Sequence, residues 1–235
     1  MAIYRLSAKI IKRSEGRCVV AAAAYRAGEN LLDETAGLYC AYGNRKGVAH
    51  KEIMLPEGAP EWMMDRARLW NDIERVERRK DSQLAREIQL ALPVELSLDA
   101  QLVCLKKFIQ EEFVALGMVA DVAVHNSDQS NPHAHVLLTM RSVGEAGFGP
   151  KGNHWNQKAL LYQWREEWAR HVNLALEREG YISRIDHRSY ADRGIDLLPS
   201  VKLGTSFGAD DTGRRWYHDG REMVEIKLEE QARRS

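Results

Sequence analysis

The sequence predicts an α+β fold: a central, mainly antiparallel sheet of about five strands with helices packed on one face. Segments in which apolar and polar residues alternate are interspersed with segments of helical periodicity. Two alternating segments, residues 118–125 and 133–141, are joined by the seven-residue connector NSDQSNP, which consists largely of turn formers. A short connector of this kind is typical of an antiparallel pair of strands.

Composition sets limits on the class of protein. The 235 residues are 44% hydrophobic and 29% charged, as in an ordinary globular protein. No apolar run approaches the roughly 18 residues that a membrane helix needs, so we expect no membrane span. The 34 basic and 34 acidic residues cancel, which excludes a basic footprint for nucleic acid over the whole chain. Three widely spaced cysteines argue against a disulfide framework and fit a reducing cytoplasm: Cys18, Cys40 and Cys104.

The elements are expected to alternate along the chain, with turn residues at their ends. In the first half we expect a strand at 2–11 with a basic outer face, a helix at 18–28 ended by Gly28, a long loop at 29–49, a weak strand at 50–55 and an amphipathic helix at 60–79. In the second half we expect strands at 84–92, 118–125 and 133–141, helices at 98–116 and 156–179, and, beyond about residue 200, a turn-rich stretch that becomes helical from Glu222.

Three histidines are the most informative residues for function. Strand side chains alternate, so His133 and His135 project from one face, and the hairpin can bring His125 beside them. Three converging imidazoles outline a site for a divalent metal ion with open positions for a ligand. Such a site suits zinc, manganese, cobalt or nickel. The alternative is that these are ordinary surface or core histidines.

The face that bears the histidines is polar on three strands. It carries Asp121, Glu87 and Gln89, whereas the other face of these strands is apolar except for Arg86. We expect the apolar face to carry the helices and the polar face to carry the chemistry. Glu87 is a candidate for orienting a histidine or the metal shell, the alternative being a solvated strand carboxylate.

Tyr25 follows four alanines, residues 21–24, on the predicted helix 18–28. Small side chains allow a helix to lie close to a sheet or to a strand of nucleic acid, although helix propensity alone also explains the alanines. A phenol is a poor nucleophile at neutral pH unless a metal ion or a nearby base assists it.

These motifs carry a family resemblance. The segments AAAAYRAGE, RKDSQLAREIQLALP and GMVADVAVHNSDQSNPHAHVLLTMR resemble the HUH endonuclease superfamily and, within it, the MobA/MobL (MobQ) plasmid relaxases of the TraA type. The resemblance extends over nearly the whole chain to about residue 204. It implies the HUH relaxase fold, with residues 1–204 as the nicking domain and 205–235 as an extension that begins a linker to further domains, often a helicase.

The resemblance also implies an activity. The family nicks one DNA strand at a plasmid origin of transfer to begin conjugation, forms a covalent 5′-phosphotyrosine and rejoins the strand. Its nucleophile matches Tyr25, its acidic strand residue matches Glu87, and its three metal ligands match His125, His133 and His135. One divalent ion is implied, manganese or magnesium first. Two positions depart from relatives: Gln89 replaces a frequent second Glu, which argues against a two-carboxylate mechanism, and Lys202 replaces a frequent His.

The expected partner is single-stranded origin-of-transfer DNA, with relaxosome accessory proteins and a type IV secretion coupling protein. By resemblance the protein is cytoplasmic in bacteria, plasmid-encoded and transferred with the DNA. Basic side chains are expected along the DNA backbone, namely Arg5, Lys9, Arg13, Arg26, Arg141, His187 and Arg188. Possible stacking residues, for which packing is the alternative, are Tyr39, His154 and Trp155.

Three other functions remain open from the sequence. A rolling-circle replication initiator or an HUH transposase uses the same chemistry, but there the tyrosine typically follows the HxH motif instead of preceding it. A non-covalent metal phosphoesterase would give Tyr25 only a structural role. A module that only binds DNA would not nick it.

Overall fold

A computed structural model describes residues 2–127, 130–196, 208–209, 215–218 and 223–226. The chain divides into two compact units, Met1–His187 and Arg188–Ser235. The expected domain boundary at residue 204 and the departure at Lys202 both lie outside the described residues.

The first unit is built on a five-stranded antiparallel sheet, which confirms the predicted α+β class. Its strands, in spatial order, are β1 (Leu6–Lys12), β5 (Gln83–Ala91), β7 (His133–Thr139), β6 (Ala120–His125) and β4 (Val48–Met54). The hairpin expected between the two histidine-bearing strands is present, with His125 paired directly with His133. β7 lies at the centre, so its side chains are flanked on both sides.

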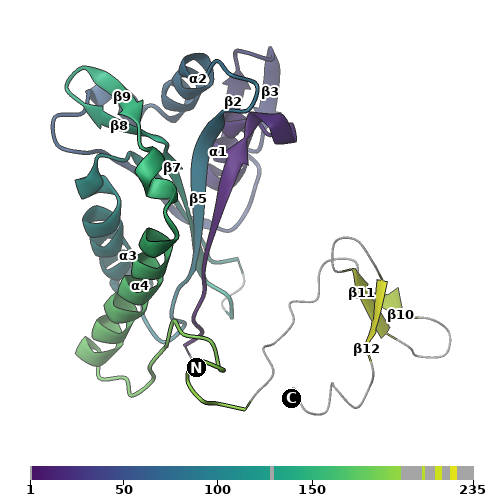
Figure 1. Ribbon diagram of the computed structural model, residues 1–235, viewed down its shortest axis with the longest axis vertical. Helices are drawn as coiled ribbons and strands as arrows, with labels where there is room; N and C mark the ends of the chain where they lie inside the picture. Colours follow the sequence, from purple (N-terminus) through teal and green to yellow (C-terminus); the bar gives the residue numbers. More distant parts are fainter. Residues whose placement is uncertain (1, 128–129, 197–207, 210–214, 219–222, 227–235) are drawn as a thin grey trace. The chain divides into compact units, whose positions relative to one another are not determined.

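One face of the sheet is covered by α3 (Leu98–Glu112) and α4 (Lys158–Arg178), which lie side by side in Figure 1. The even-numbered residues of β6 and β7 form the main core with these helices, together with Phe108, Trp164 and Trp168. This is the apolar face that strand alternation predicted. None of the helices in the described part of the chain is both long enough and apolar enough to span a membrane.

The opposite face also carries helices, so the expectation of helices on one face was too narrow. A second core contains side chains from α1 (Val19–Ala27) and α2 (Arg66–Val76), packed on residues such as Leu137 and Ile53. The cause is the small side chains of α1: Ala23 and Ala24 are buried, so the helix lies close to the sheet beside the polar residues. Gly28 ends α1 in the left-handed conformation, as the sequence predicted.

Two further expectations about local structure were wrong. The helix expected at 60–79 is broken, because Asp65 adopts an extended conformation and caps α2 through a bond to the Arg68 N–H. The segment expected as a loop at 29–49 contains a small hairpin, β2 (Asn30–Asp33) with β3 (Leu38–Ala41), whose turn has Gly37 at a φ of 64°.

A second small hairpin, absent from the sequence analysis, follows β7. It consists of β8 (Arg141–Gly144) and β9 (Gly147–Lys151). Both small hairpins have only four or five residues per strand, too few for alternation to stand out from a loop. The remaining elements are single 3₁₀ turns at Arg13–Glu15, Glu61–Met64, Val114–Leu116 and Asn153–Asn156.

The second unit contains a three-stranded antiparallel sheet of β10 (Gly208–Ala209), β11 (Arg215–His218) and β12 (Met223–Ile226). The helix expected from Glu222 is therefore wrong over residues 223–226. This stretch contains the β-branched residues Val224 and Ile226 in alternation and pairs with β11, so pairing outweighs the surrounding charge pattern.

A buried ion pair joins α2 to the sheet. The Arg66 guanidinium donates to both carboxylate oxygens of Asp121 at 2.9 to 3.0 Å, and Trp70 Nε1 donates to the same carboxylate at 2.8 Å. Glu29 accepts a further bond from Arg66 at 2.6 Å. Asp121, which the sequence places on the polar face, is thus a structural residue.

Removal of one partner from this pair is expected to destabilise the fold. Arg66→Met leaves the Asp121 charge buried without its main partner, so we expect the free energy of unfolding to fall by about 3–5 kcal/mol. Arg68→Met removes an exposed arginine of the same helix and should change the free energy of unfolding by less than about 0.5 kcal/mol. Urea unfolding followed by circular dichroism measures both, and equal effects of the two substitutions would contradict the structural role.

Candidate metal and nucleophile site

The three predicted histidines converge. The centroids of the His125, His133 and His135 rings are 4.9 to 5.3 Å apart. Each ring offers one nitrogen to a set whose members all lie within 4.8 Å of one another. Strand register explains the convergence, because His125 and His133 are direct partners across β6 and β7 and His135 follows two residues later on the same face.

Each ring is held by a hydrogen bond from its other nitrogen. His125 donates from Nε2 to the carbonyl oxygen of Arg26 at 2.7 Å, and His133 donates from Nδ1 to the carbonyl oxygen of Asn131 at 2.8 Å. His135 donates from Nδ1 to Oε1 of Glu87 at 2.8 Å. A nitrogen that donates a proton has no free lone pair, so each imidazole keeps one nitrogen for a cation. This is the pattern of metal-ligating histidines.

Glu87 is the junction between the cluster and α1. Its Oε1 accepts from His135 and from the Arg26 guanidinium, whose Nε and Nη2 each lie 2.7 Å away. Burial raises the pKa of this carboxyl, but the hydrogen bond from His135 and the charge and hydrogen bond of Arg26 outweigh it and hold the pKa at about 2. Glu87 is therefore a carboxylate at neutral pH and a poor proton acceptor.

Burial favours the neutral form of His125 and His133. Burial lowers the pKa of His125 to about 4, with further lowering from the charges of His135, Arg45 and His133. Burial likewise lowers the pKa of His133. Only neutral imidazole has a lone pair for a metal ion, so at neutral pH protons compete little for these two nitrogens.

Tyr25 lies on the exposed side of α1, next to the residue that binds the cluster. Its side chain is 44% exposed, and its ring packs edge-on against Tyr42 at 5.3 Å between centroids. The guanidinium of Arg45 lies over the ring face, 3.6 Å from its centroid. These contacts fix the ring, while the hydroxyl makes no hydrogen bond with any described residue. Helix α1 packs on the sheet face that carries the histidines, and Tyr25 lines a cleft together with Glu87 of that face.

A cleft of about 400 Å³ lies beside Tyr25. Tyr25 and Glu87 both line it, together with Lys9, Arg17 and Cys18. Cys18 is not a competing nucleophile, because burial, followed by its hydrogen bond to Asp33, raises the pKa of the thiol to about 12. The cleft therefore presents a phenol beside basic side chains.

The basic residues expected along DNA fall into two groups. Lys9 is exposed and lines the cleft, and Arg5 donates to Oε1 of Gln89 at 3.2 Å on the same sheet face. In contrast, Arg13 binds Glu74, and Arg141 donates to Glu77 at 2.8 Å. The second group is already engaged with carboxylates, so its role in DNA binding is still only a prediction.

Other candidate contacts are less well placed by the structure. His187 lies 3.9 Å from Asp186, and Arg188 begins the second unit. Their DNA contacts therefore remain predictions. Among the stacking candidates, Trp155 is buried in the main core, which makes it a packing residue, whereas Tyr39 and His154 are exposed.

Several residues of the site were not expected from the sequence. Arg26 was expected only as a DNA contact, but its carbonyl and its guanidinium both hold the cluster. Tyr42 and Arg45 lie in the segment expected as a loop, and no local motif marks them as neighbours of Tyr25. Asn131 contributes a backbone carbonyl, which any residue possesses. The one feature of the sequence that could have indicated the role of Arg26 is its position directly after Tyr25, the candidate nucleophile.

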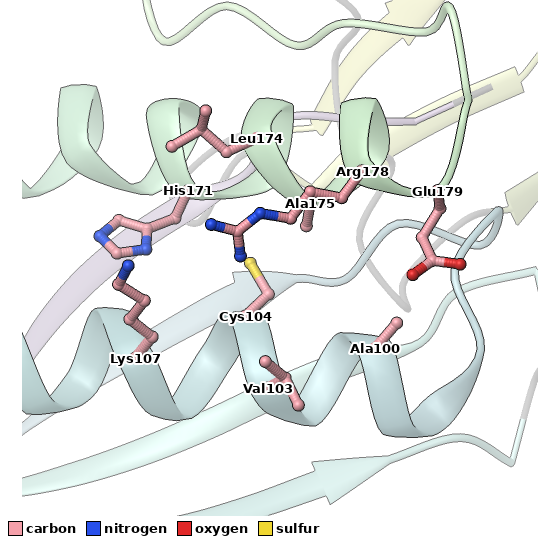
Figure 2. A pocket seen from close by; sticks show the side chains of 9 residues that line it. All are labelled: Ala100, Val103, Cys104, Lys107, His171, Leu174, Ala175, Arg178 and Glu179. Atoms are coloured by element: carbon pink, nitrogen blue, oxygen red, sulfur yellow. The ribbon is translucent and has the colours of Figure 1, made fainter.

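A separate hollow lies between α3 and α4, on the face of the sheet away from the histidines. Figure 2 shows Cys104 and Val103 of α3 opposite Leu174 and Arg178 of α4. Burial raises the pKa of the Cys104 thiol to about 12, so this cysteine is not nucleophilic at neutral pH. The hollow therefore does not compete with the histidine cluster as a site of chemistry.

Conjugal transfer and mobilization proteins are similar in sequence to this chain. The conjugal transfer protein TraA of Rhizobium radiobacter is 34% identical over 99% of this chain, which covers 24% of TraA. The mobilization protein MobL of Acidithiobacillus ferridurans is 37% identical over 87% of this chain and 62% of its own length. The chain thus spans about a quarter of TraA and under two thirds of MobL.

Solved structures share the fold. A structure described as the molecular basis of vancomycin resistance transfer in Staphylococcus aureus superposes with a TM-score of 0.76 at 33% identity, over 80% of this chain and 100% of that chain. The conjugative relaxase TrwC, solved with oriT DNA in a metal-bound form, superposes with a TM-score of 0.51 at 16% identity, over 85% of this chain and 87% of that chain. Residues 17–211 match the MobA/MobL family. The chain therefore belongs to the MobA/MobL family.

Proposed function

We propose that this protein is a relaxase that nicks and rejoins one DNA strand at a plasmid origin of transfer, with Tyr25 as the nucleophile. The observation that carries the proposal is a pair of hydrogen bonds: the Arg26 carbonyl oxygen accepts from His125, and the Arg26 guanidinium donates to Glu87. These bonds hold the helix of Tyr25 against a histidine cluster of the metal-binding type. Family membership, a relative named for conjugal transfer and a fold shared with a conjugative relaxase support it.

The residues fit one divalent cation. His125, His133 and His135 each leave one nitrogen free, and Glu87 is engaged with His135 and Arg26 and thus orients a ligand. Three neutral imidazoles do not cancel the charge of the ion. When bound, a divalent cation supplies Lewis-acid stabilisation of the charge that develops on a phosphate oxygen. The donor set is compatible with manganese, zinc, cobalt or nickel, and with magnesium by family analogy.

The proposed step exchanges one phosphodiester for another. The Tyr25 oxygen bonds to phosphorus while the bond from phosphorus to the 3′ oxygen breaks, and the phenol proton is balanced by a proton taken up at the 3′ oxygen. The product is a 5′-phosphotyrosine and a free 3′ hydroxyl. Because the bonds formed and broken are alike, the strand can be rejoined without ATP.

Two arginines support this step. Arg45 holds the Tyr25 ring, because its guanidinium lies over the ring face, 3.6 Å from the centroid. Arg26 fixes the carboxylate that orients His135. Glu87, with a pKa of about 2, acts as a positioning residue and not as the proton acceptor.

The proposed substrate is single-stranded DNA, since an intact duplex does not present a phosphate inside a narrow cleft. Lys9 and Arg17 line the cleft and would bind its backbone. Relaxosome proteins, a coupling protein, a bacterial cytoplasmic location and transfer with the DNA remain predictions from the family. The position of Tyr25 before the HxH motif favours a relaxase over a replication initiator or transposase.

Replacement of Tyr25 by Phe is the direct test of the nucleophile. Tyr25→Phe keeps the ring contacts with Tyr42 and Arg45 but removes the attacking oxygen, so we expect nicking to fall by at least about a thousandfold. The measurement is a denaturing gel of labelled single-stranded origin DNA incubated with Mn²⁺, on which the wild type gives a slow protein–DNA adduct.

Tyr42→Phe is the matched control, because it removes a neighbouring hydroxyl and keeps the edge-on ring. It should retain the adduct. If Tyr25→Phe still cleaves the DNA at the wild-type rate without forming an adduct, the protein is a non-covalent phosphoesterase. If the wild type binds the DNA but leaves it intact with the metal present, it is a binding module.

Neutralisation of Glu87 tests its positioning role. Glu87→Gln keeps the volume but weakens the bonds from His135 and Arg26, so Mn²⁺ affinity should fall by about 10- to 100-fold. Glu61→Gln, at an exposed glutamate on the turn Glu61–Met64, should leave the Mn²⁺ affinity unchanged. Isothermal titration calorimetry measures both affinities, and an unchanged affinity in Glu87→Gln would show that the carboxylate does not orient the site.

The lowered pKa of His125 predicts a pH dependence for the metal-free protein. The folded-state pKa of about 4 lies below the ordinary value of 6.5, so protons bind preferentially to the unfolded chain. This contribution to stability is present above about pH 6.5 and is lost as the pH falls toward about 4. Thermal unfolding at several pH values should show the loss in the wild type and a smaller loss in His125→Gln. An equal loss in both proteins would contradict the assignment to His125.

A further inference from the structure

Arg86 is a buried cation that has no counter-ion among the residues that the structure describes. It lies on β5, on the face that packs against α4, and its side chain is only 3% exposed. Nη2 donates to Oδ1 of Asn156 at 2.6 Å, but Nη1 is buried and makes no hydrogen bond. Within the described part of the chain, no carboxylate forms an ion pair with it. Arg66, in contrast, is buried against Asp121.

A buried guanidinium in this state is energetically unfavourable. Loss of solvation lowers the pKa of Arg86 to about 10, which still leaves the group charged at neutral pH. The ring of Trp164, 5.1 Å from the guanidinium carbon, offers a weak attraction and no full neutralisation. An unpaired buried charge with an unsatisfied donor usually serves a function other than stability, such as binding a ligand. A hydrophobic side chain of similar size would be at least as stable there.

The surroundings of Arg86 select for an anion. It lines a hollow of about 180 Å³, and the two other charged residues of the lining, Lys9 and Lys158, are also basic. None of the residues that line the hollow, all of them described, is acidic. Leu161 and Trp164 add apolar walls. The planar guanidinium of Arg86, whose Nη1 is unpaired, and the two lysines of the same lining match the oxygens of a phosphate.

The hollow and the cleft of the proposed function share one lining residue, Lys9. Lys9 lines both the hollow and the cleft that holds Tyr25 and Glu87, and its strand, β1, is the edge strand of the sheet. A strand of DNA bound in the cleft therefore has a basic path over this edge. We infer that Arg86, with Lys9 and Lys158, forms a second anion site that binds a backbone phosphate of the same single-stranded DNA, away from the bond that is cut. This inference rests on the proposed function.

Equilibrium binding in the presence of EDTA tests the site without any nicking. The probe is fluorescein-labelled oligothymidylate, and the readout is anisotropy over a range of salt concentrations. Loss of one phosphate contact should reduce the slope of log affinity against log salt by about 0.7 in Arg86→Met. We expect its affinity at low salt to fall about 10-fold, as for loss of a charge-assisted contact. Arg178→Met removes one basic residue elsewhere on α4 and should leave slope and affinity near wild type.

Thermal unfolding separates a binding role from a structural one. Arg86→Met should unfold at the wild-type temperature or above, because it removes an unpaired buried charge. Lys158→Met changes an exposed residue of the same hollow, so its fold should be unaffected and its salt slope reduced, which keeps the test valid if Arg86→Met fails to fold. Wild-type slopes in both variants would overturn the inference.

Two further outcomes separate this inference from the proposed function. If inorganic phosphate raises the unfolding temperature of the wild type but not of Arg86→Met, while DNA binding is unchanged, the site takes a free oxyanion and the DNA assignment is overturned. A reduced salt slope in Arg86→Met together with an unimpaired adduct in Tyr25→Phe would support the anion site and refute the proposed nucleophile.

Discussion

The bonds of Arg26 are the constraint on which the site depends. Its carbonyl oxygen holds His125, and its guanidinium holds Glu87, which in turn holds His135. One residue of α1 thus orients two of the three imidazoles, and the residue before it is Tyr25. The bonds of Arg26 thus fix α1 beside the histidine cluster, and Tyr25 of this helix lines a cleft with Glu87.

The sheet separates stability from chemistry by its two faces. Even-numbered residues of β6 and β7 pack against α3 and α4, while the odd-numbered face carries the histidines. Helix α1 packs against the odd-numbered face, and its small alanine side chains allow a close approach to the strands. Close packing lets a backbone carbonyl reach an imidazole, and the resulting burial keeps His125 neutral at neutral pH. Packing, protonation and metal affinity are thereby linked.

Strand alternation was sufficient to predict the convergence of the histidines, because a period of two fixes the face of each side chain. It also predicted the role of Glu87 toward a histidine. It could not predict partners that come from loops: Arg45 and Tyr42 meet Tyr25 only after the hairpin of β2 and β3 has formed. The sequence also does not show whether a given basic side chain binds DNA or a carboxylate of the protein itself. Arg13 and Arg141, both predicted to contact DNA, bind carboxylates of the protein itself, whereas the buried Arg86 forms no ion pair with any described carboxylate.

The central claim is that the Tyr25 phenol and the three imidazoles surround one cation. Paramagnetic relaxation measures this directly: 3-fluorotyrosine is incorporated at position 25 and its ¹⁹F signal is followed as Mn²⁺ is added. We expect strong broadening of the signal at one equivalent of Mn²⁺, and no broadening in His135→Ala at the same concentration. A signal that stays sharp while calorimetry shows the metal bound to the histidines would place the phenol away from the ion and contradict the account.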